Sequence, residues 1–165
     1  MKNGGYLVYK KELIQLLESG TDRWNAFRGQ NPGVVMLNGA LLAEAQLARV
    51  DLHRAFLLNS DFQRANLEGA ILERAIMRKT NLRGSDLRSA RIDGADLFSA
   101  DLSGADLRDA SLACTFLRRA DLRGADLSTA LGLVPSQIAD AVGDLATRLP
   151  DNLPRPASWV TRSSG

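Results

Sequence analysis

The residues best suited to chemistry are few and far apart. His53 is the only histidine and Cys114 the only cysteine of the 165 residues, so the sequence contains no zinc-binding cluster and no Cys–His or Ser–His–Asp set. Carboxylates are abundant, and Asp86, Asp106 and Asp126 recur every twenty residues. Stacked carboxylates can bind a cation, but a repeated role in turns explains them without one. We therefore predict no enzymatic activity, no cofactor and no metal site.

The elements that carry these residues are defined by a strict period of five. Every fifth residue from Leu37 to Leu127 is large and apolar, at nineteen positions, and sixteen of these are Leu. The residue two places earlier is small, and it is Ala thirteen times. The unit is Ala-(Asp/Asn)-Leu followed by two variable residues, as in 100–104 and 105–109.

A period of five fits neither a helix, which needs a mean spacing near 3.6, nor a simple strand, which needs 2. It fits a short extended segment followed by a corner. Residues two apart in an extended segment point to the same side, so the small residue and the Leu both face inward. Fixed short periods of this kind indicate a solenoid.

This pattern, over residues 35–129, resembles the pentapeptide-repeat family. The resemblance implies an all-β solenoid, a right-handed quadrilateral β-helix with four repeats per coil, so that nineteen repeats make about 4.75 coils. We expect a helical cap and leader at 1–34, the β-helix at 35–129, and a C-terminal helix with an extended tail at 130–165, all in one structural domain. The leader, which includes Leu17-Glu18-Ser19-Gly20 and Trp24-Asn25-Ala26-Phe27-Arg28, is similar to leaders of bacterial members.

The corners have their own signature. Asp or Asn precedes the large inward residue ten times, where a short acceptor can bond a nearby backbone N–H. Six repeats end in Gly, at 39, 69, 84, 94, 104 and 124, which favours a turn with positive φ.

The two ends break the repeat and are predicted to close the tube, because an open solenoid end exposes core and unpaired backbone. An apolar face within 10–19 predicts a helix that ends at Gly20, and Trp24 and Phe27 are available to pack over the first coil. Pro135 favours the start of a second helix running from 133 to about 149, before Pro150. We expect Trp159 to dock the tail.

The first residues lack the apolar stretch of a secretory signal, and no apolar run approaches the length of a membrane span. We therefore expect a cytoplasmic protein without membrane contact.

The charge balance bears on the best-known activity implied by the resemblance. Some members mimic the shape and acidity of DNA, bind DNA gyrase and protect against gyrase poisons. Residues 35–129 contain thirteen acids and thirteen bases, and the whole chain has a net charge of +2. This balance disfavours a DNA mimic, which we keep as the alternative function. The mixed charges, without an aromatic platform, also predict no direct nucleic-acid binding.

One side departs from the repeat pattern. With twenty residues per coil, the repeats centred at 37, 57, 77, 97 and 117 stack as one side, here called side A. Six of its outward positions are large and apolar where Asp, Asn or other polar residues are usual. The residues of this candidate surface are Met36, Phe56, Leu58, Ile76, Phe98 and Phe116, with Arg78 and Arg118 among them.

An apolar surface of this size is normally covered. We favour covering by the chain itself, either by the C-terminal helix with Ile138, Val142 and Leu145 or by the N-terminal segment 6–9. The other interpretation is that side A binds another protein or a second copy of this chain as a homodimer. The sequence therefore predicts a protein-interaction or scaffold module of the pentapeptide-repeat type.

Overall fold

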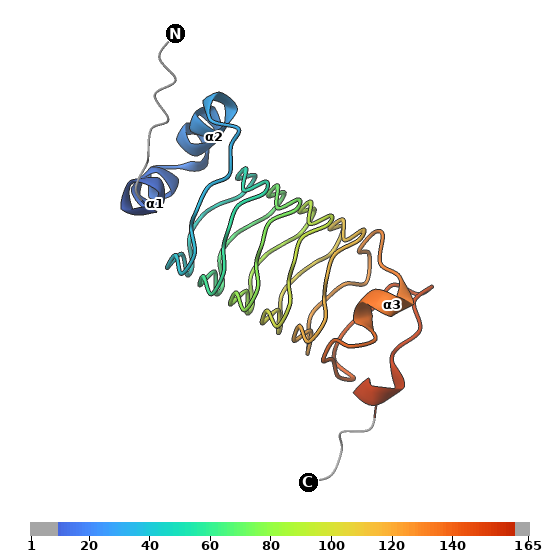
Figure 1. Cartoon of the computed structure of the whole chain (residues 1–165). Helices are drawn as coiled ribbons and strands as arrows, with labels where there is room; N and C mark the ends of the chain where they lie inside the picture. The colour runs from blue at the N-terminus through green and yellow to red at the C-terminus, as the bar shows by residue number, and fades with distance from the viewer. Residues whose placement is uncertain (1–9, 161–165) are drawn as a thin grey trace.

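Parallel β-bridges set the architecture of the rod. The structure is a computed structural model, which describes residues 10–160 (Figure 1). The bridges join residues twenty apart, beginning with Met36 to Phe56 and Leu41 to Asp61. Four repeats therefore complete one turn of the chain, and the turns stack along the rod axis (Figure 1). The predicted strand-and-corner repeat is confirmed.

The inward positions form one continuous core. All nineteen large residues at the fifth positions are 3% exposed or less. The small residues beside them leave room for these side chains in a narrow tube. Where the small residue is polar, its hydroxyl is bonded: Ser60 donates to the Leu37 carbonyl and Thr80 to the Leu57 carbonyl. The tube is therefore filled without unpaired hydroxyl groups at these positions.

The corners are held by side-chain hydrogen bonds. Each of the ten Asp and Asn residues before the inward position accepts the backbone N–H of the residue two places ahead. They are Asp51, Asp61, Asn66, Asn81, Asp86, Asp96, Asp101, Asp106, Asp121 and Asp126. The six predicted glycines have φ between 62° and 66°, and twelve other residues at the same repeat position have φ between 54° and 61°. The turn thus imposes a left-handed backbone even where the sequence lacks Gly.

Two helices cover the N-terminal end (Figure 1): α1 (Lys10–Glu18) and α2 (Thr21–Gln30). The first matches the predicted helix, whereas the second lies beyond it. Leu13, Leu17 and Trp24 are buried. The Trp24 Nε1–H donates to the Asp51 carbonyl at 2.7 Å, and the Asn25 side chain both donates to Arg49 and accepts from Asp51. Within residues 10–160, no helix is long and apolar enough to cross a membrane.

The predicted C-terminal helix over 133–149 is wrong. Only α3 (Pro135–Ile138) is helical, and Val142 and Arg148 then form parallel bridges with Asp121 and Asp126. The carbonyls of Val142 and Arg148 accept the backbone N–H groups of Leu122 and Leu127. A helix through this region would have left those two donors of the last coil unpaired, so the chain continues the β-helix instead.

The tail docks as predicted. Trp159 lies in the 3₁₀ turn η1 (Ala157–Trp159), is buried, and donates from Nε1 to the Ala141 carbonyl at 3.0 Å. Its ring lies against Gly143, where a Cβ atom would come within 2.3 Å of the ring. Gly143 is therefore required for the tryptophan to pack at this end.

Candidate interaction surface

Side A brings four of the predicted surface residues, Met36, Phe56, Ile76 and Phe116, into one column. Consecutive bridges join Met36, Phe56, Ile76, Asp96 and Phe116 along the rod. Met36 is 52% and Phe116 63% exposed, whereas Phe56 and Ile76 between them are half-buried. The ends of the column are therefore open, and its middle is shielded by stacked neighbours.

A second column of side A contains Leu58, Arg78, Phe98 and Arg118 and is partly charged. The Arg78 Nε donates to Asp96 Oδ2 at 2.6 Å. The guanidinium groups of Arg78 and Arg119 each lie 6.0 Å from the centre of the Phe98 ring, within reach of a cation–π interaction. Arg119 was not singled out by the sequence, because it occupies a corner rather than an outward position of side A.

The C-terminal segment does not lie along side A, which corrects the favoured interpretation for that segment. Ile138 is buried at the end of the tube, while Val142 is 40% and Leu145 66% exposed. The reason is that the segment continues the coils across the end of the rod (Figure 1). The N-terminal alternative, residues 6–9, lies outside the described residues.

The opposite side, side C, is centred on residues 47, 67, 87, 107 and 127 and is polar. Asp86 and Asp106 are joined by a bridge and lie twenty residues apart. Arg88 donates to both oxygens of Asp86, and Arg108 does the same at Asp106. These hydrogen bonds lower the pKa of both carboxyl groups below the usual value. The acids of side C are therefore largely neutralised by adjacent arginines.

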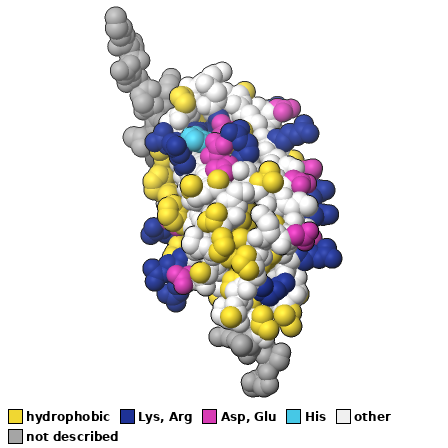
Figure 2. Space-filling model, turned by 90° about the vertical axis from the view of Figure 1, so that its right-hand side faces the viewer, with side chains coloured by type: hydrophobic (Ala, Val, Ile, Leu, Met, Phe, Trp, Pro, Cys, Tyr) yellow, Lys and Arg dark blue, Asp and Glu magenta, His cyan; other side chains and the backbone are white. Residues whose placement is uncertain are grey.

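The side chains that could do chemistry are not assembled into a site. Among residues 10–160, no group of three or more His, Cys, Asp or Glu side chains is placed to hold a metal ion. His53 lies 3.7 Å from Glu73, and Figure 2 shows the histidine beside acidic and basic side chains. Cys114 is exposed on the last coil. The histidine and the cysteine thus sit on different coils and do not form a pair.

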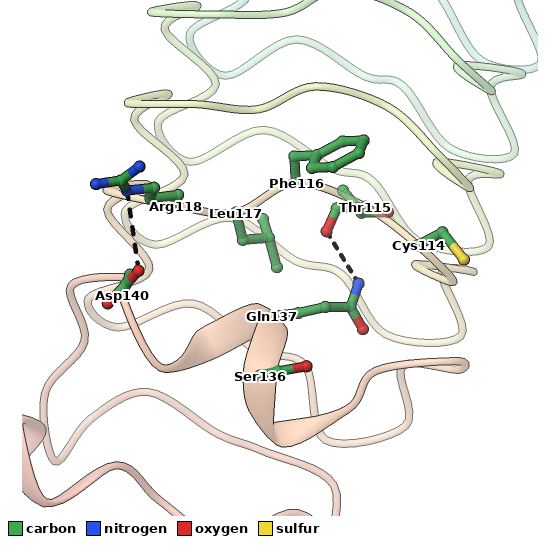
Figure 3. A pocket seen from close by; sticks show the side chains of 8 residues that line it. All are labelled: Cys114, Thr115, Phe116, Leu117, Arg118, Ser136, Gln137 and Asp140. Carbon is green, nitrogen blue, oxygen red and sulfur yellow. Dashed lines mark hydrogen bonds and ion pairs between the residues drawn. The ribbon is translucent and has the colours of Figure 1, made fainter.

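A pocket of about 290 Å³ lies at the C-terminal end of side A, between the last coil and α3 (Figure 3). It is lined by Cys114, Thr115, Phe116, Leu117, Arg118, Ser136, Gln137 and Asp140. The Gln137 side chain spans from α3 to the coil and donates to the carbonyls of Leu112 and Thr115 at 2.8 and 3.0 Å. No pattern in the sequence marks this pocket, because it depends on where α3 ends.

The comparisons with known proteins establish the family. The family model for pentapeptide repeats matches in eight copies, over residues 36–69, 65–104 and 100–130. These segments span more than half of the chain, which therefore belongs to the pentapeptide-repeat family. No match was found among curated proteins.

Several solved structures are similar. Rfr23, a pentapeptide-repeat protein from the cyanobacterium Cyanothece 51142, is 28% identical with a TM-score of 0.55, covering 76% of this chain and 97% of that one. The protein alr5209 from Nostoc Pcc 7120 is 32% identical with a TM-score of 0.35, covering 79% and 86%. QnrB1, a plasmid-mediated fluoroquinolone resistance protein, is 16% identical with a TM-score of 0.39, covering 68% and 74%. The likeness to Rfr23 supports the right-handed β-helical solenoid of the family.

Proposed function

We propose that this protein is a non-enzymatic binding module that docks a partner protein, or a second copy of itself, on side A. The observation that carries the proposal is the apolar column that includes Met36, Phe56, Ile76 and Phe116, which is exposed at its two ends and half-buried between them. Nothing in the tube requires large apolar residues at these outward positions, because the core is already filled by the inward residues.

The column also departs from the hydrogen bonding that holds the other corners. None of these four residues can accept the N–H two places ahead, as Asp86 and Asp106 do on side C. The structure compensates at one corner, where Asn38 of the preceding coil accepts the Leu58 N–H at 2.9 Å. An outward residue that weakens its own corner is better explained by a contact outside the fold than by stability.

The composition of side A suits a protein partner. Aromatic residues and Arg are enriched in the energetically important parts of protein interfaces. Phe98 between Arg78 and Arg119 is such a group. The paired acids of side C supply no continuous negative stripe, so no observation favours the alternative role as a DNA mimic.

The first test is the solution molar mass, measured by light scattering, of the native protein and of the Phe56→Asp/Phe98→Asp variant. If side A joins two copies, the native protein is a dimer and the variant is a folded monomer. If the native protein is a monomer, side A does not join two copies, and a second test is needed for a different partner.

That second test places a photo-crosslinking amino acid at Leu58 on side A and, in a matched variant, at Glu68 on side C of the same coil. We expect crosslinks to a discrete protein from Leu58 and not from Glu68, with loss of those crosslinks when Phe56→Asp/Phe98→Asp is added. The proposal would be overturned if the native protein is a monomer and the probes at Leu58 and Glu68 crosslink to the same proteins equally.

A further inference from the structure

The charges of the repeat region are unevenly distributed around the rod. Side A, with the two corners that bound it, contains six bases and one acid. The bases are Arg54, Arg74, Arg78, Lys79, Arg118 and Arg119, and the acid is Asp96. The other three sides of 35–129 contain seven bases and twelve acids. The neutral total of the repeat region therefore conceals a basic side A.

Most of these bases have no acidic partner. All six are exposed. The Arg78 Nε lies 2.6 Å from Asp96, and the Arg118 Nε lies 3.8 Å from Asp140. Seven of the twelve acids on the other sides are likewise in ion pairs with arginines. Within residues 10–160, four bases of side A form no ion pair, and they are Arg54, Arg74, Lys79 and Arg119.

The acids of the neighbouring sides are held where they stand. Glu73 precedes one corner and is paired with Arg91. Asp121 follows the other corner and accepts hydrogen bonds from the Arg123 guanidinium. Three further acids beside the corners accept backbone or uncharged side-chain donors, and they are Asp61, Asp93 and Asp101. The four unpaired bases therefore remain available to a ligand.

These four bases stand on both edges of the apolar column. Arg54 and Arg74 occupy successive coils of the corner before side A, and Lys79 and Arg119 occupy the corner after it. Coils are about 4.8 Å apart, so Lys79 and Arg119 are separated by roughly 10 Å along the rod. An apolar centre with a charged, exposed rim is the usual anatomy of a protein interface. The sign of the rim selects the partner.

A second copy of this chain fits the surface poorly. In a symmetric dimer the same patch meets itself, so the six bases of one protomer would face the six bases of the other. Opposed like charges weaken such an association. The charge of side A therefore favours a different protein over self-association.

Other polyanions match only part of the surface. Nucleic acid offers phosphates for the bases but gains most from aromatic rings that stack on its own bases. The Phe98 ring is flanked by the guanidinium groups of Arg78 and Arg119. An anionic membrane gains from apolar side chains that insert, whereas Phe56 and Ile76 are half-buried. A protein can match the column and the charges together.

We propose that side A docks a different protein through an acidic surface with an apolar centre. Acids of the partner pair with Arg54 and Arg74 at one corner and with Lys79 and Arg119 at the other. Its apolar residues cover the column between the corners. This inference deepens the proposed function, rests on it for the use of side A, and selects between its two occupants.

The test measures binding of the full chain to a random copolymer of glutamate and tyrosine, with a copolymer of lysine and tyrosine as the charge-reversed probe. We expect the native protein to bind the acidic copolymer and not the basic one. Added salt should weaken this binding, because exposed charges are screened.

Two variants with the same loss of charge locate the binding surface. Replacing the four unpaired bases of side A (Arg54→Gln/Arg74→Gln/Lys79→Gln/Arg119→Gln) should weaken binding about tenfold or more. The control replaces four exposed bases outside side A that also form no ion pair within residues 10–160 (Lys11→Gln/Arg23→Gln/Arg49→Gln/Arg83→Gln) and should bind as the native protein does. Both variants should keep the native urea midpoint, because the replaced side chains are exposed.

A third variant separates charge from shape. Arg54→Lys/Arg74→Lys/Arg119→Lys keeps the charge of both corners and should retain binding. The same three variants apply to the protein that the probe at Leu58 crosslinks. Its capture should be lost only in the variant that removes the four bases of side A.

The inference is overturned if the acidic copolymer does not bind, or if the two glutamine variants bind it equally. It is also overturned if duplex DNA or phosphatidylserine vesicles bind side A more tightly than the copolymer does. A native dimer that Phe56→Asp/Phe98→Asp separates would overturn this inference and support the proposed function. Equal crosslinking from Leu58 and Glu68 in a monomer would instead remove the proposed function itself, so the two failures are distinguishable.

Discussion

Sides A and C are opposite faces of one tube, and along the stacked coils they differ chiefly in what points outward. Inside, Met77 on side A and Leu87 on side C are both fully buried. Outside, side A presents a column of apolar residues, whereas side C presents Asp86, Asp106 and their arginines. The width of the tube dictates the inward residues. The outward residues are free to vary, so their departures from the repeat are where we propose that binding is encoded.

The largest expected effect tests whether the two sides share an equivalent interior. Met77→Ala and Leu87→Ala each remove a fully buried side chain and should lower the free energy of unfolding by about 2–5 kcal/mol. Urea unfolding measures both, and the exposed Glu68→Ala is the control, with an expected change within about 0.5 kcal/mol. A loss confined to one side would show that the interiors are not equivalent.

The next largest effect tests the difference between the outward residues of side C and those of side A. Asp106→Ala removes the acceptor of the Arg108 N–H and should cost about 1 kcal/mol. Phe56→Asp should instead change the free energy of unfolding by less than about 0.5 kcal/mol and abolish association, if side A is an interface.

The same variant also tests the opposing interpretation of side A. A large loss of stability in Phe56→Asp, without a change in molar mass, would mean that a segment of the chain covers this side. An unchanged urea midpoint together with an unchanged molar mass would contradict both interpretations.

A smaller effect on the free energy of unfolding is expected from the aspartates that pair with arginines. Hydrogen bonds from Arg88, Arg108 and Arg123 hold the pKa of Asp86, Asp106 and Asp121 below their usual range. A lowered pKa in the folded state stabilises the fold above the unfolded pKa, about 3.9, and this contribution is lost as pH falls through the folded pKa. We therefore expect a lower urea midpoint at pH 3 than at pH 7.

The matched control is the Arg88→Gln/Arg108→Gln/Arg123→Gln variant. It removes the donors that lower these three pKa values, so the difference between the midpoints at pH 3 and pH 7 should shrink. A pH dependence equal to that of the native protein would show that these three pairs contribute nothing to it.

The last prediction is that the protein has no effect on DNA gyrase. Because the acids of side C are paired with arginines, we expect no inhibition of DNA gyrase supercoiling at roughly micromolar protein. Inhibition at that concentration would restore the DNA-mimic alternative and shift attention from side A to the acidic positions.

The repeat region could be predicted in detail because each of its interactions is local or falls at a fixed offset. The Asp86 carboxylate bonds the N–H two residues on, and its bridge partner Asp106 lies twenty residues on. The residues of side A were likewise placed together by the period alone. Whether a segment of the chain covers side A could not be predicted, because the sequence does not specify where the C-terminal segment runs.

The sequence by itself determined the inward face, the corners, the helix at Lys10–Glu18 and the column of side A. Only the tertiary structure decided how the ends close, because the donors and acceptors to be satisfied there exist only after the coils have stacked. Thus α3 ends at Ile138, Val142 and Arg148 resume the β-pairing, and Gln137 bonds Thr115.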